Sequence, residues 1–283
     1  MLRTLLLCIL ALAVTASASA QDSLDVTVLS RDGHAATLAD VVNAMAEADV
    51  VFLGEQHDDS LGHVVQHHLL RAAQEAYGEQ RRVVLGLEMF ETDVQLALDE
   101  YAAGLIRERD FLDAARPWGN YARDYRPLVE YAIAEGLPVV ATNAPKRYVS
   151  RVSREGGLDA LAALSEAGRA TMPAEIIAPS EAMSEAFLAL MGGAASHGSI
   201  PGMPSVDGML AAQNLRDATM AWALHRAMES GDLALHLDGA FHSDGGIGIP
   251  EHLARIAPEL RVVTVTIGPE ATPGRDAFAI VTR

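Results

Sequence analysis

The sequence contains two short motifs of the form Gly-x-x-His, and each follows a run of apolar residues. They are Gly54-Glu55-Gln56-His57 and Gly239-Ala240-Phe241-His242. A further acidic residue, Glu88, ends the apolar run VVLGLE. Histidines and glutamates gathered in one pocket could bind a divalent metal ion and leave a carboxylate as general base for a water molecule. The candidate metal-binding or catalytic residues are therefore Glu55, His57, Glu88 and His242.

Each of these residues also has an ordinary structural explanation. Glu55 could do no more than complement a helix dipole, and a single histidine is more often a satisfied structural residue than a ligand. Glu88 is harder to explain in this way, because burying a carboxylate without a partner costs several kcal/mol. Taken together, the four residues favour a shared functional site.

The elements that must position these residues alternate along the chain. Short runs rich in Val, Ile and Leu, which predict strands, are separated by longer segments of helical periodicity. Continuous apolar strands separated by helices indicate an α/β fold with a mainly parallel sheet flanked by helices. The predicted strands are Val26–Leu29, Val50–Leu53, Val83–Leu87, Pro138–Thr142, Ala234–Leu237, Val262–Ile267 and Ala277–Val281. The predicted helices are one capped by Asp59 or Ser60 that ends at Tyr77, and Thr92–Ala103, Arg126–Glu135 and Asp207–Met228.

Polar residues follow four of the predicted strands. In an open parallel sheet, ligands bind at the carboxyl ends of the strands, because loops converge there and helix N-termini point their N–H groups to the same edge. We therefore expect these side chains to share one pocket, with each member of the candidate site within roughly 8 Å of another. The residues in question are Glu55 and His57, Glu88, Asn143, and Asp238 and His242.

The alternation of strands and helices stops in the second half of the chain. Between about residues 147 and 206 there are only helical segments, followed by a stretch rich in Gly, Ser and Pro at residues 191–208. Such a composition is typical of a connection or lid. We expect residues 147–206 to form a smaller helical subdomain or lid, and residues 21–146 and 207–283 to form the α/β domain. Gln213, Arg216 and Asp217, just after the insertion, could face the pocket.

The first 20 residues predict a signal peptide, because one Arg precedes a continuous apolar run that ends in Ala-Ser-Ala. The only cysteine, Cys8, lies in this segment, so the mature chain is expected to lack disulfides and Cys-ligated metals. The formal net charge of −17 argues against nucleic acid and anionic membranes as partners. We expect a protein exported to the periplasm or the extracellular space.

Several blocks of the sequence resemble the ChaN-like family of haem-binding uptake proteins, within the Tiki/TraB/erythromycin-esterase superfamily. They are GEQHDD, GLEMF, WGNYARDYRPLVEYA, ATNAP and DGAFHSDGGIGIPEHLAR, and in this order they cover most of residues 50–253. The resemblance implies a parallel α/β domain with a helical subdomain, export, and haem bound through a tyrosine between two subunits. It also implies outer-membrane haem uptake machinery as a partner. Family members are often lipoproteins, but this signal segment lacks a cysteine at its end, so lipid tethering is not expected.

Under this resemblance, tyrosines are the candidate ligands of the haem iron. Tyr125 is the first candidate, Tyr121 lies one helical turn before it, and Tyr148 is a third. A deprotonated tyrosine binds ferric haem, and Arg123 or Arg126 could lower its pKa or pair with a haem propionate. Aromatic residues before a helix also commonly serve packing alone.

His242 and Asn143 complete the expected haem contacts, and His57 or His242 becomes the candidate iron ligand if no tyrosine serves. His63 and His67 are four residues apart and could chelate a metal, although most such pairs are solvated. The leading interpretation is an exported haem-binding protein that serves haem or iron uptake. The alternative is a metal-dependent hydrolase that uses the Glu/His cluster.

Overall fold

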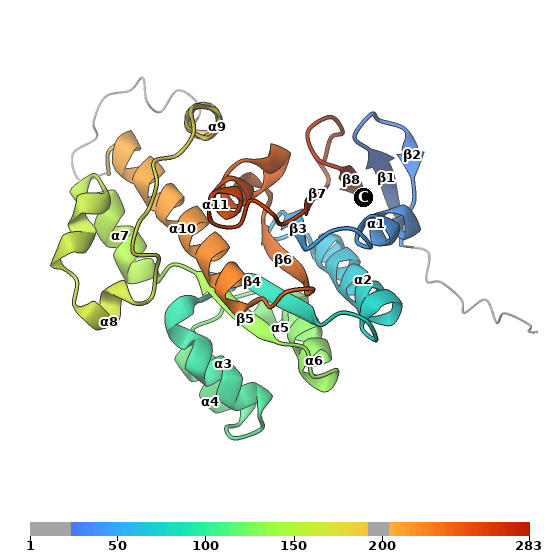
Figure 1. Ribbon diagram of the computed structural model, residues 1–283, viewed down its shortest axis with the longest axis horizontal. Helices are drawn as coiled ribbons and strands as arrows, with labels where there is room; N and C mark the ends of the chain where they lie inside the picture. The colour runs from blue at the N-terminus through green and yellow to red at the C-terminus, as the bar shows by residue number, and fades with distance from the viewer. Residues whose placement is uncertain (1–23, 192–203) are drawn as a thin grey trace, which may run out of the picture.

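An eight-stranded sheet forms the centre of the molecule (Figure 1). The computed structural model describes residues 24–191 and 204–283. The strand order is β2-β1-β8-β7-β3-β6-β4-β5; the strands from β8 to β5 are parallel, and β1 and β2 are antiparallel to their neighbours. The predicted α/β fold with a mainly parallel sheet is confirmed. The strands are β1 Val26–Ser30, β2 Ala35–Ala36, β3 Val50–Glu55, β4 Val83–Glu91, β5 Val139–Asn143, β6 Leu233–Gly239, β7 Val262–Ile267 and β8 Phe278–Thr282.

Two strands differ most from the prediction, and the bounds of the others lie within two residues of the predicted ones. β2 was not predicted, because two residues are too few to show a periodicity. β4 continues to Glu91 instead of ending at Leu87, so Glu88 lies inside the strand. The pairing of β4 with β5 is regular up to Leu87 and then shifts, so that Glu91 pairs with Asn143. A shift of this kind bends a strand and changes the direction of its side chains, and here it begins at the position of Glu88.

The central strands are apolar throughout because both faces of the sheet are covered. Val51 and Leu53 of β3 belong to one hydrophobic core, whereas Val50 and Phe52 belong to a second core on the other face, as expected when successive side chains alternate. The first core is covered by α1 Leu38–Ala44, α2 Ser60–Tyr77, α3 Gln95–Ala102, α4 Glu108–Ala115, α5 Tyr121–Asp124 and α6 Arg126–Ala134. The second is covered by α10 Val206–Ala227 and α11 Ile249–Ile256.

Helix α2 begins at one of the two predicted caps. The carboxylate of Asp59 accepts a hydrogen bond from the backbone N–H of Leu61 at 3.1 Å, which satisfies a donor that has no partner within the first turn. Because Asp59 lies two residues after His57, this cap fixes the start of α2 close to the first Gly-x-x-His motif.

The outer edge of the sheet at β5 is closed by a side chain. The amide of Gln95 donates to the carbonyl of Val139 at 2.9 Å and accepts from the N–H of Ala141 at 2.7 Å. These are the two groups that one residue of a further parallel strand would contact. Gln95 therefore occupies a position at which another chain could otherwise pair.

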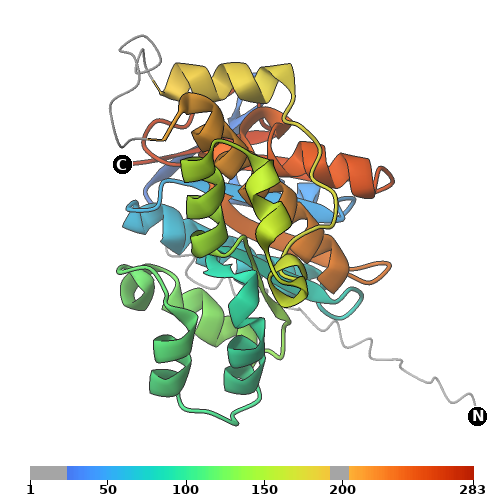
Figure 2. The same ribbon diagram turned by 90° about the vertical axis from the view of Figure 1, so that its left-hand side faces the viewer.

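Residues 146–191 contain helices and no strand (Figure 2). They are α7 Lys146–Glu155, the 3-10 helix η2 Leu158–Ala163, α8 Glu166–Arg169 and α9 Glu181–Leu190. α7 lies against α10 at Gly208, where an added Cβ would collide with the carbonyl oxygen of Ser153. A third small core joins α7 and η2 to α10 and includes Val149, Val152, Leu161, Met172 and Leu215. The division into an α/β domain and a helical lid stays a prediction.

The expected signal peptide, residues 1–20, lies outside the described residues, and so does most of the Gly/Ser/Pro-rich stretch. In the described part of the chain, no helix combines the length and the apolarity that crossing a bilayer requires.

Candidate functional site

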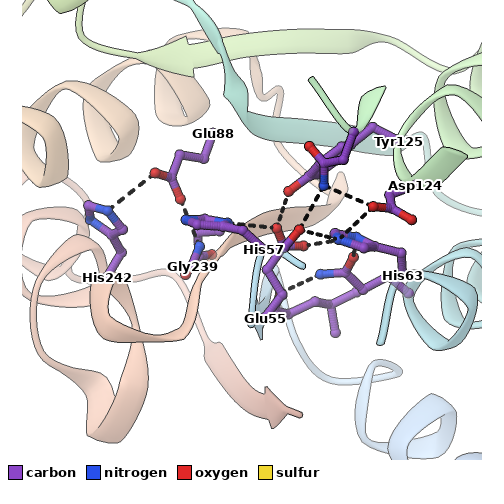
Figure 3. Close-up of polar contacts among 12 residues, drawn as sticks. Glu55, His57, His63, Glu88, Asp124, Tyr125, Gly239 and His242 are labelled. Carbon is purple, nitrogen blue, oxygen red and sulfur yellow. Dashed lines mark hydrogen bonds and ion pairs between the residues drawn. The ribbon is translucent and has the colours of Figure 1, made fainter. Parts of the chain in front are cut away.

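The carboxyl ends of three adjacent strands bring the candidate residues together (Figure 3). Glu55 is the last residue of β3, Glu88 lies near the end of β4, and His242 lies in the 3-10 helix η4, Ala240–His242, which directly follows β6. β6 lies between β3 and β4 in the sheet. The side chains form two hydrogen-bonded networks, one around Glu55 and one around His242, and His57 lies between them.

The glycines of the two motifs allow the motifs to contact each other. In the parallel register of β3 and β6, Glu55 lies opposite Gly239. A Cβ on Gly239 would lie 2.8 Å from Cε1 and 2.9 Å from Nε2 of His57. A Cβ on Gly54 would lie 3.0 Å from the Cα of Ala240. Each motif therefore needs a glycine so that the other can pack against it, which is a physical reason for their common form.

The first network converges on the carboxylate of Glu55, which is only 4% exposed. Oε1 of Glu55 lies 3.0 Å from Nδ1 of His57 and also accepts a hydrogen bond from the hydroxyl of Tyr125. Its Oε2 lies 3.3 Å from Nδ1 of the buried His63. Burial raises the pKa of Tyr125 far above its ordinary value, and the negative charge of Glu55 adds to this effect. In this arrangement Tyr125 is a neutral phenol that donates to Glu55.

The loop that carries His57 is held by residues of the α5 region. The amide of Asn120 donates to the carbonyl of His57 at 2.7 Å and to the carboxylate of Asp124 at 2.9 Å. Nε2 of His63 lies 3.2 Å from the same carbonyl. Arg123 donates to both oxygens of Asp124 at 2.7 and 2.8 Å. The backbone of the first motif is thus anchored by groups that lie outside it.

The second network places His242 between two buried carboxylates. Its Nδ1 donates to Asp217, and its Nε2 lies 3.3 Å from Oε1 of Glu88. The other oxygen of Glu88 accepts from the N–H of Gly239 at 2.7 Å. The amide nitrogen of Gln213 lies 2.9 Å from Nδ1 of His242.

The charges of this network follow from its geometry. Burial would lower the pKa of His242, but the two carboxylates outweigh burial and hold its pKa well above the ordinary value. Burial would likewise raise the pKa of Glu88, but His242, His57 and the N–H of Gly239 outweigh it and hold that pKa well below its ordinary value. Burial raises the pKa of Asp217. His242 is therefore an imidazolium paired with the ionised carboxylate of Glu88.

His57 is the accessible member of the group. Its side chain is 48% exposed, compared with 2% for Glu55, and the side chains of His242 and Glu88 are 8% and 4% exposed. The ring lies edge-on to Trp118, with 4.5 Å between ring centroids. Burial would lower the pKa of His57, but the hydrogen bond to Glu55 and the charge of Glu88 raise it above its ordinary value.

The other two candidate tyrosines do not join either network. Tyr121 is buried in an aromatic cluster, with ring centroids 6.0 Å from Phe90 and 6.5 Å from Phe111. Burial raises its pKa well above the ordinary value. Tyr148 lies on α7, where the guanidinium of Arg147 stacks over its ring at 4.4 Å from the centroid. Both rings therefore pack, which is the role that aromatic residues near helices commonly have.

Arg126 and Asn143 also lie outside the two networks. Nε of Arg126 donates to Oε1 of Glu108 in α4, and its Nη2 donates to Oε2 of the same residue at 3.1 Å. The charge of Arg126 is therefore already paired. Asn143 is buried at the end of β5, and its Oδ1 has no hydrogen-bond partner among the described residues. His67 packs against the ring of Tyr131 at 5.6 Å, and His63 is buried, so the two histidines are not a solvated pair.

The predicted metal ligands are close together but are not arranged around a common centre. Oε1 of Glu55 is engaged by His57 and Tyr125. Its Oε2 lies 3.3 Å from Nδ1 of His63 but has no hydrogen-bond partner among the described residues. Glu88 is engaged by His242 and by the N–H of Gly239. In the parts of the chain that the structure covers, no group of three or more His, Cys, Asp or Glu side chains has a metal-binding arrangement. The arrangement gives no support to the alternative of a divalent metal site.

Several residues of these networks were not predicted from the sequence. Asp124 and Asn120 lie inside the WGNYARDYRP block, but only the aromatic and basic residues of that block were assigned roles. His63 was considered only together with His67. It lies in the first turn of α2, six residues after His57, and its Nε2 contacts the carbonyl of His57. Gln213 and Asp217 were expected to face the pocket, and both contact His242.

Several solved structures match this chain. ChaN of Campylobacter jejuni, in a structure described as cofacial heme binding, matches with a TM-score of 0.71 and 16% identity over 91% of this chain and 97% of that chain. RRSP, a MARTX toxin effector domain from Vibrio vulnificus, matches with a TM-score of 0.47 and 14% identity over 88% of this chain and 38% of that chain. An erythromycin esterase mutant in its open conformation matches with a TM-score of 0.45 and 14% identity over 86% of this chain and 78% of that chain. No curated protein matches the chain significantly.

The family model described as haem-binding uptake, Tiki superfamily, ChaN matches residues 41–253. This stretch contains both Gly-x-x-His motifs and every residue of the two networks around Glu55 and His242. Because the match covers well over half of the chain, and the fold is that of ChaN, the protein belongs to the ChaN family of haem-binding uptake proteins in the Tiki superfamily.

Proposed function

We propose that this chain binds haem at the carboxyl edge of its sheet and serves haem or iron uptake. The observation that carries the proposal is the meeting of both Gly-x-x-His motifs at this edge, within the segment that matches the haem-binding family. The printed description of the Campylobacter jejuni relative, cofacial heme binding, supports the same ligand.

The chemistry of the residues at this edge fits haem. A haem site needs a donor atom for the iron and apolar surface for the porphyrin. His57 offers a half-exposed imidazole. Trp118 stands beside it, and Phe241 of the second motif is partly exposed and packs against Phe187 of α9 with 6.2 Å between ring centroids. When bound, haem would supply the iron, and these residues would supply an axial ligand and apolar contacts.

Export, dimerisation and transfer to outer-membrane uptake machinery belong to the same proposal. The apolar N-terminal segment ending in Ala-Ser-Ala supports export to the periplasm or the extracellular space. A homodimer is proposed because the resemblance implies haem held between subunits. No specific observation favours the metal-dependent hydrolase, since the predicted ligands pair with one another.

Titration of the purified chain, residues 21–283, with hemin tests the proposal. A saturable Soret band with a stoichiometric end point is expected. Trp118→Ala should weaken binding, because it removes apolar surface beside His57. Leu105→Ala is the matched control, since Leu105 is 74% exposed and belongs to neither network. An absorbance that rises without saturation would contradict haem binding.

Light scattering with and without hemin tests the dimer. The proposal expects two chains per particle when hemin is bound. A monomer at every hemin concentration that saturates the Soret band would reject the shared site and leave haem binding intact.

A further inference from the structure

We infer that a cavity along the outer edge of β5 binds a small aromatic carboxylate, with the indole ring of Trp222 as its platform and the guanidinium of Arg226 as its charge partner. The inference goes beyond the proposed function. None of the residues that line this cavity belongs to the network around Glu55 or to the network around His242.

The cavity lies beside the last strand of the sheet. β5 is the outermost strand on this side, and α3 and α10 both contact it. Residues 138–141 line the cavity from the sheet, Gln95 and Asp99 line it from α3, and Trp222 and Arg226 line it from α10. Its volume is about 470 Å³, which is within the range of roughly 300–1,000 Å³ that is usual for small-molecule sites.

A strand from another chain is not the occupant that this geometry favours. The side-chain amide of Gln95 already bonds the carbonyl of Val139 and the N–H of Ala141, which an added strand would need for pairing. Asp99 on the same wall accepts a hydrogen bond from Gln95 at 2.8 Å. The occupant is therefore a small molecule that gains apolar contact here, rather than a peptide that pairs with the backbone.

Trp222 presents an aromatic surface that lies outside the hydrophobic cores. It is partly exposed and belongs to none of the three cores. The wall around it is apolar and includes the short side chains of Ala141, Ala223 and Ala227. An indole beside small residues leaves room for a flat ring, and contact between two aromatic rings contributes more than the buried area alone.

Arg226 carries a charge that the protein does not neutralise with a direct partner. Its guanidinium lies over the ring of Trp222, 4.6 Å from the centroid, and the two residues share one face of α10 because they are four apart. Among the described residues, no carboxylate forms an ion pair with Arg226, although the chain has a formal net charge of −17. A guanidinium stacked on a ring still directs N–H groups outward in its own plane, where they can bind a carboxylate through two hydrogen bonds.

These features together select an aromatic anion. Of the residues that line the cavity, only Arg226 is basic. The carboxylate of Asp99 is exposed, so water screens its repulsion of a bound anion. An aromatic carboxylate can pack its ring against Trp222 and pair its charge with Arg226, whereas a sugar would leave the apolar wall without an apolar partner.

Indole N–H signals in ¹H–¹⁵N NMR spectra of the purified chain, residues 21–283, locate a bound probe. The chain has two tryptophans, Trp118 and Trp222, and Trp222→Phe identifies the signal of the second. The probe is 2-naphthoate, which joins a flat apolar ring system to one carboxylate. It should shift the Trp222 signal in a saturable way and leave the signal of Trp118, which lies beside His57, in place.

Arg226→Gln tests the charge partner, and 2-naphthamide is the matched ligand because it has the same shape without the charge. The parent chain should bind 2-naphthoate roughly tenfold more tightly than 2-naphthamide, as expected for a hydrogen bond to a charged group. Arg226→Gln should lose this preference, and Trp222→Ala should bind both ligands more weakly. Arg255→Gln is the matched control, because Arg255 is exposed in the last turn of α11 and lies outside the cavity.

Three results would overturn the inference. They are the lack of a saturable shift of the Trp222 signal, a shift of the Trp118 signal alone, and an Arg226→Gln variant that keeps the preference for the carboxylate. The inference does not depend on haem binding, so Arg226→Gln should give the same Soret titration as the parent chain. Loss of hemin binding in this variant, with a circular dichroism spectrum that shows it folded, would assign the cavity to the haem site and also reject the inference.

Discussion

Replacing His242 with alanine tests whether the second network contains a buried charge. His242 is 6% exposed and lies between Asp217 and Glu88, which are 1% and 3% exposed. Removing the imidazolium leaves the buried carboxylates of Glu88 and Asp217 without the cation that lies between them. Breaking a buried ion pair in this way costs about 3–5 kcal/mol of the free energy of unfolding.

A second histidine in the same fold serves as the matched control. His252 of α11 is 9% exposed, and its Nε2 donates to the amide oxygen of Asn214 at 2.9 Å. Burial lowers the pKa of His252 to about 4, so its ring is neutral at pH 7. His252→Ala removes the same ring and one neutral hydrogen bond, which costs about 1–3 kcal/mol. The cavity contributions are similar, so His242→Ala should be less stable than His252→Ala by about 2 kcal/mol.

Urea denaturation of both variants and the parent chain at pH 7 measures this difference. A gap of about 2 kcal/mol corresponds to a difference in Tm of about 4–8 °C for a domain of this size. Equal destabilisation of the two variants would refute the buried imidazolium, because the lost ring volume is the same in both.

The pH dependence gives an independent check with opposite signs. The raised pKa of His242 means that its contribution is fully present below its unfolded value of about 6.5 and is lost as the pH rises through the folded value. The lowered pKa of His252 means that its contribution is present above about 6.5 and is lost as the pH falls towards about 4. The deficit of His242→Ala should therefore shrink at alkaline pH, and that of His252→Ala at acidic pH. A common trend in both variants would reject the assigned charges.

Three further changes have expected outcomes. Gly239→Ala introduces no backbone strain, since the φ of Gly239 is −59°, but the added methyl group displaces the ring of His57. Haem affinity should therefore fall in a hemin titration, while the free energy of unfolding falls by only about 1 kcal/mol. Gln95→Ala frees two backbone groups of β5 and should lower the free energy of unfolding by about 1–2 kcal/mol. It should also promote concentration-dependent association, measured by light scattering. A strictly monomeric variant would contradict the role of Gln95 in closing the edge of the sheet. Tyr121→Phe removes a buried hydroxyl that has no hydrogen-bond partner among the described residues, so the urea midpoint should stay the same or rise. A marked loss of stability would contradict this and show that the hydroxyl forms a hydrogen bond.

The meeting of the candidate residues at one edge of the sheet could be predicted because its signals are local. The apolar runs Val50–Leu53 and Ala234–Leu237 predict strands, and the alternation with helices predicts that the strands are parallel. Parallel strands place their carboxyl ends at one edge whatever their order in the sheet. For the same reason the sequence limited the cap of α2 to Asp59 or Ser60, since a cap depends on residues within one turn.

The end of β4 could not be predicted from such signals. The sequence continues LEMFE after Leu87, and a glutamate in an apolar run normally marks the end of a buried strand. Glu88 remains inside the strand because Gly239 and His242, more than 150 residues later, supply its hydrogen-bond donors. Nothing near Glu88 in the sequence indicates these donors.

The sequence alone established the fold class, the edge at which polar side chains gather and the members of the two Gly-x-x-His motifs. Only the tertiary structure decided which of these groups are charged, which are exposed and which form hydrogen bonds or ion pairs with one another. Tyr125 meets Glu55 across 70 residues of chain, and His242 meets Asp217 across 25. The protonation and availability of a side chain depend on burial and on neighbours within a few ångströms, and these neighbours are set by the packing of helices on the sheet rather than by the order of residues.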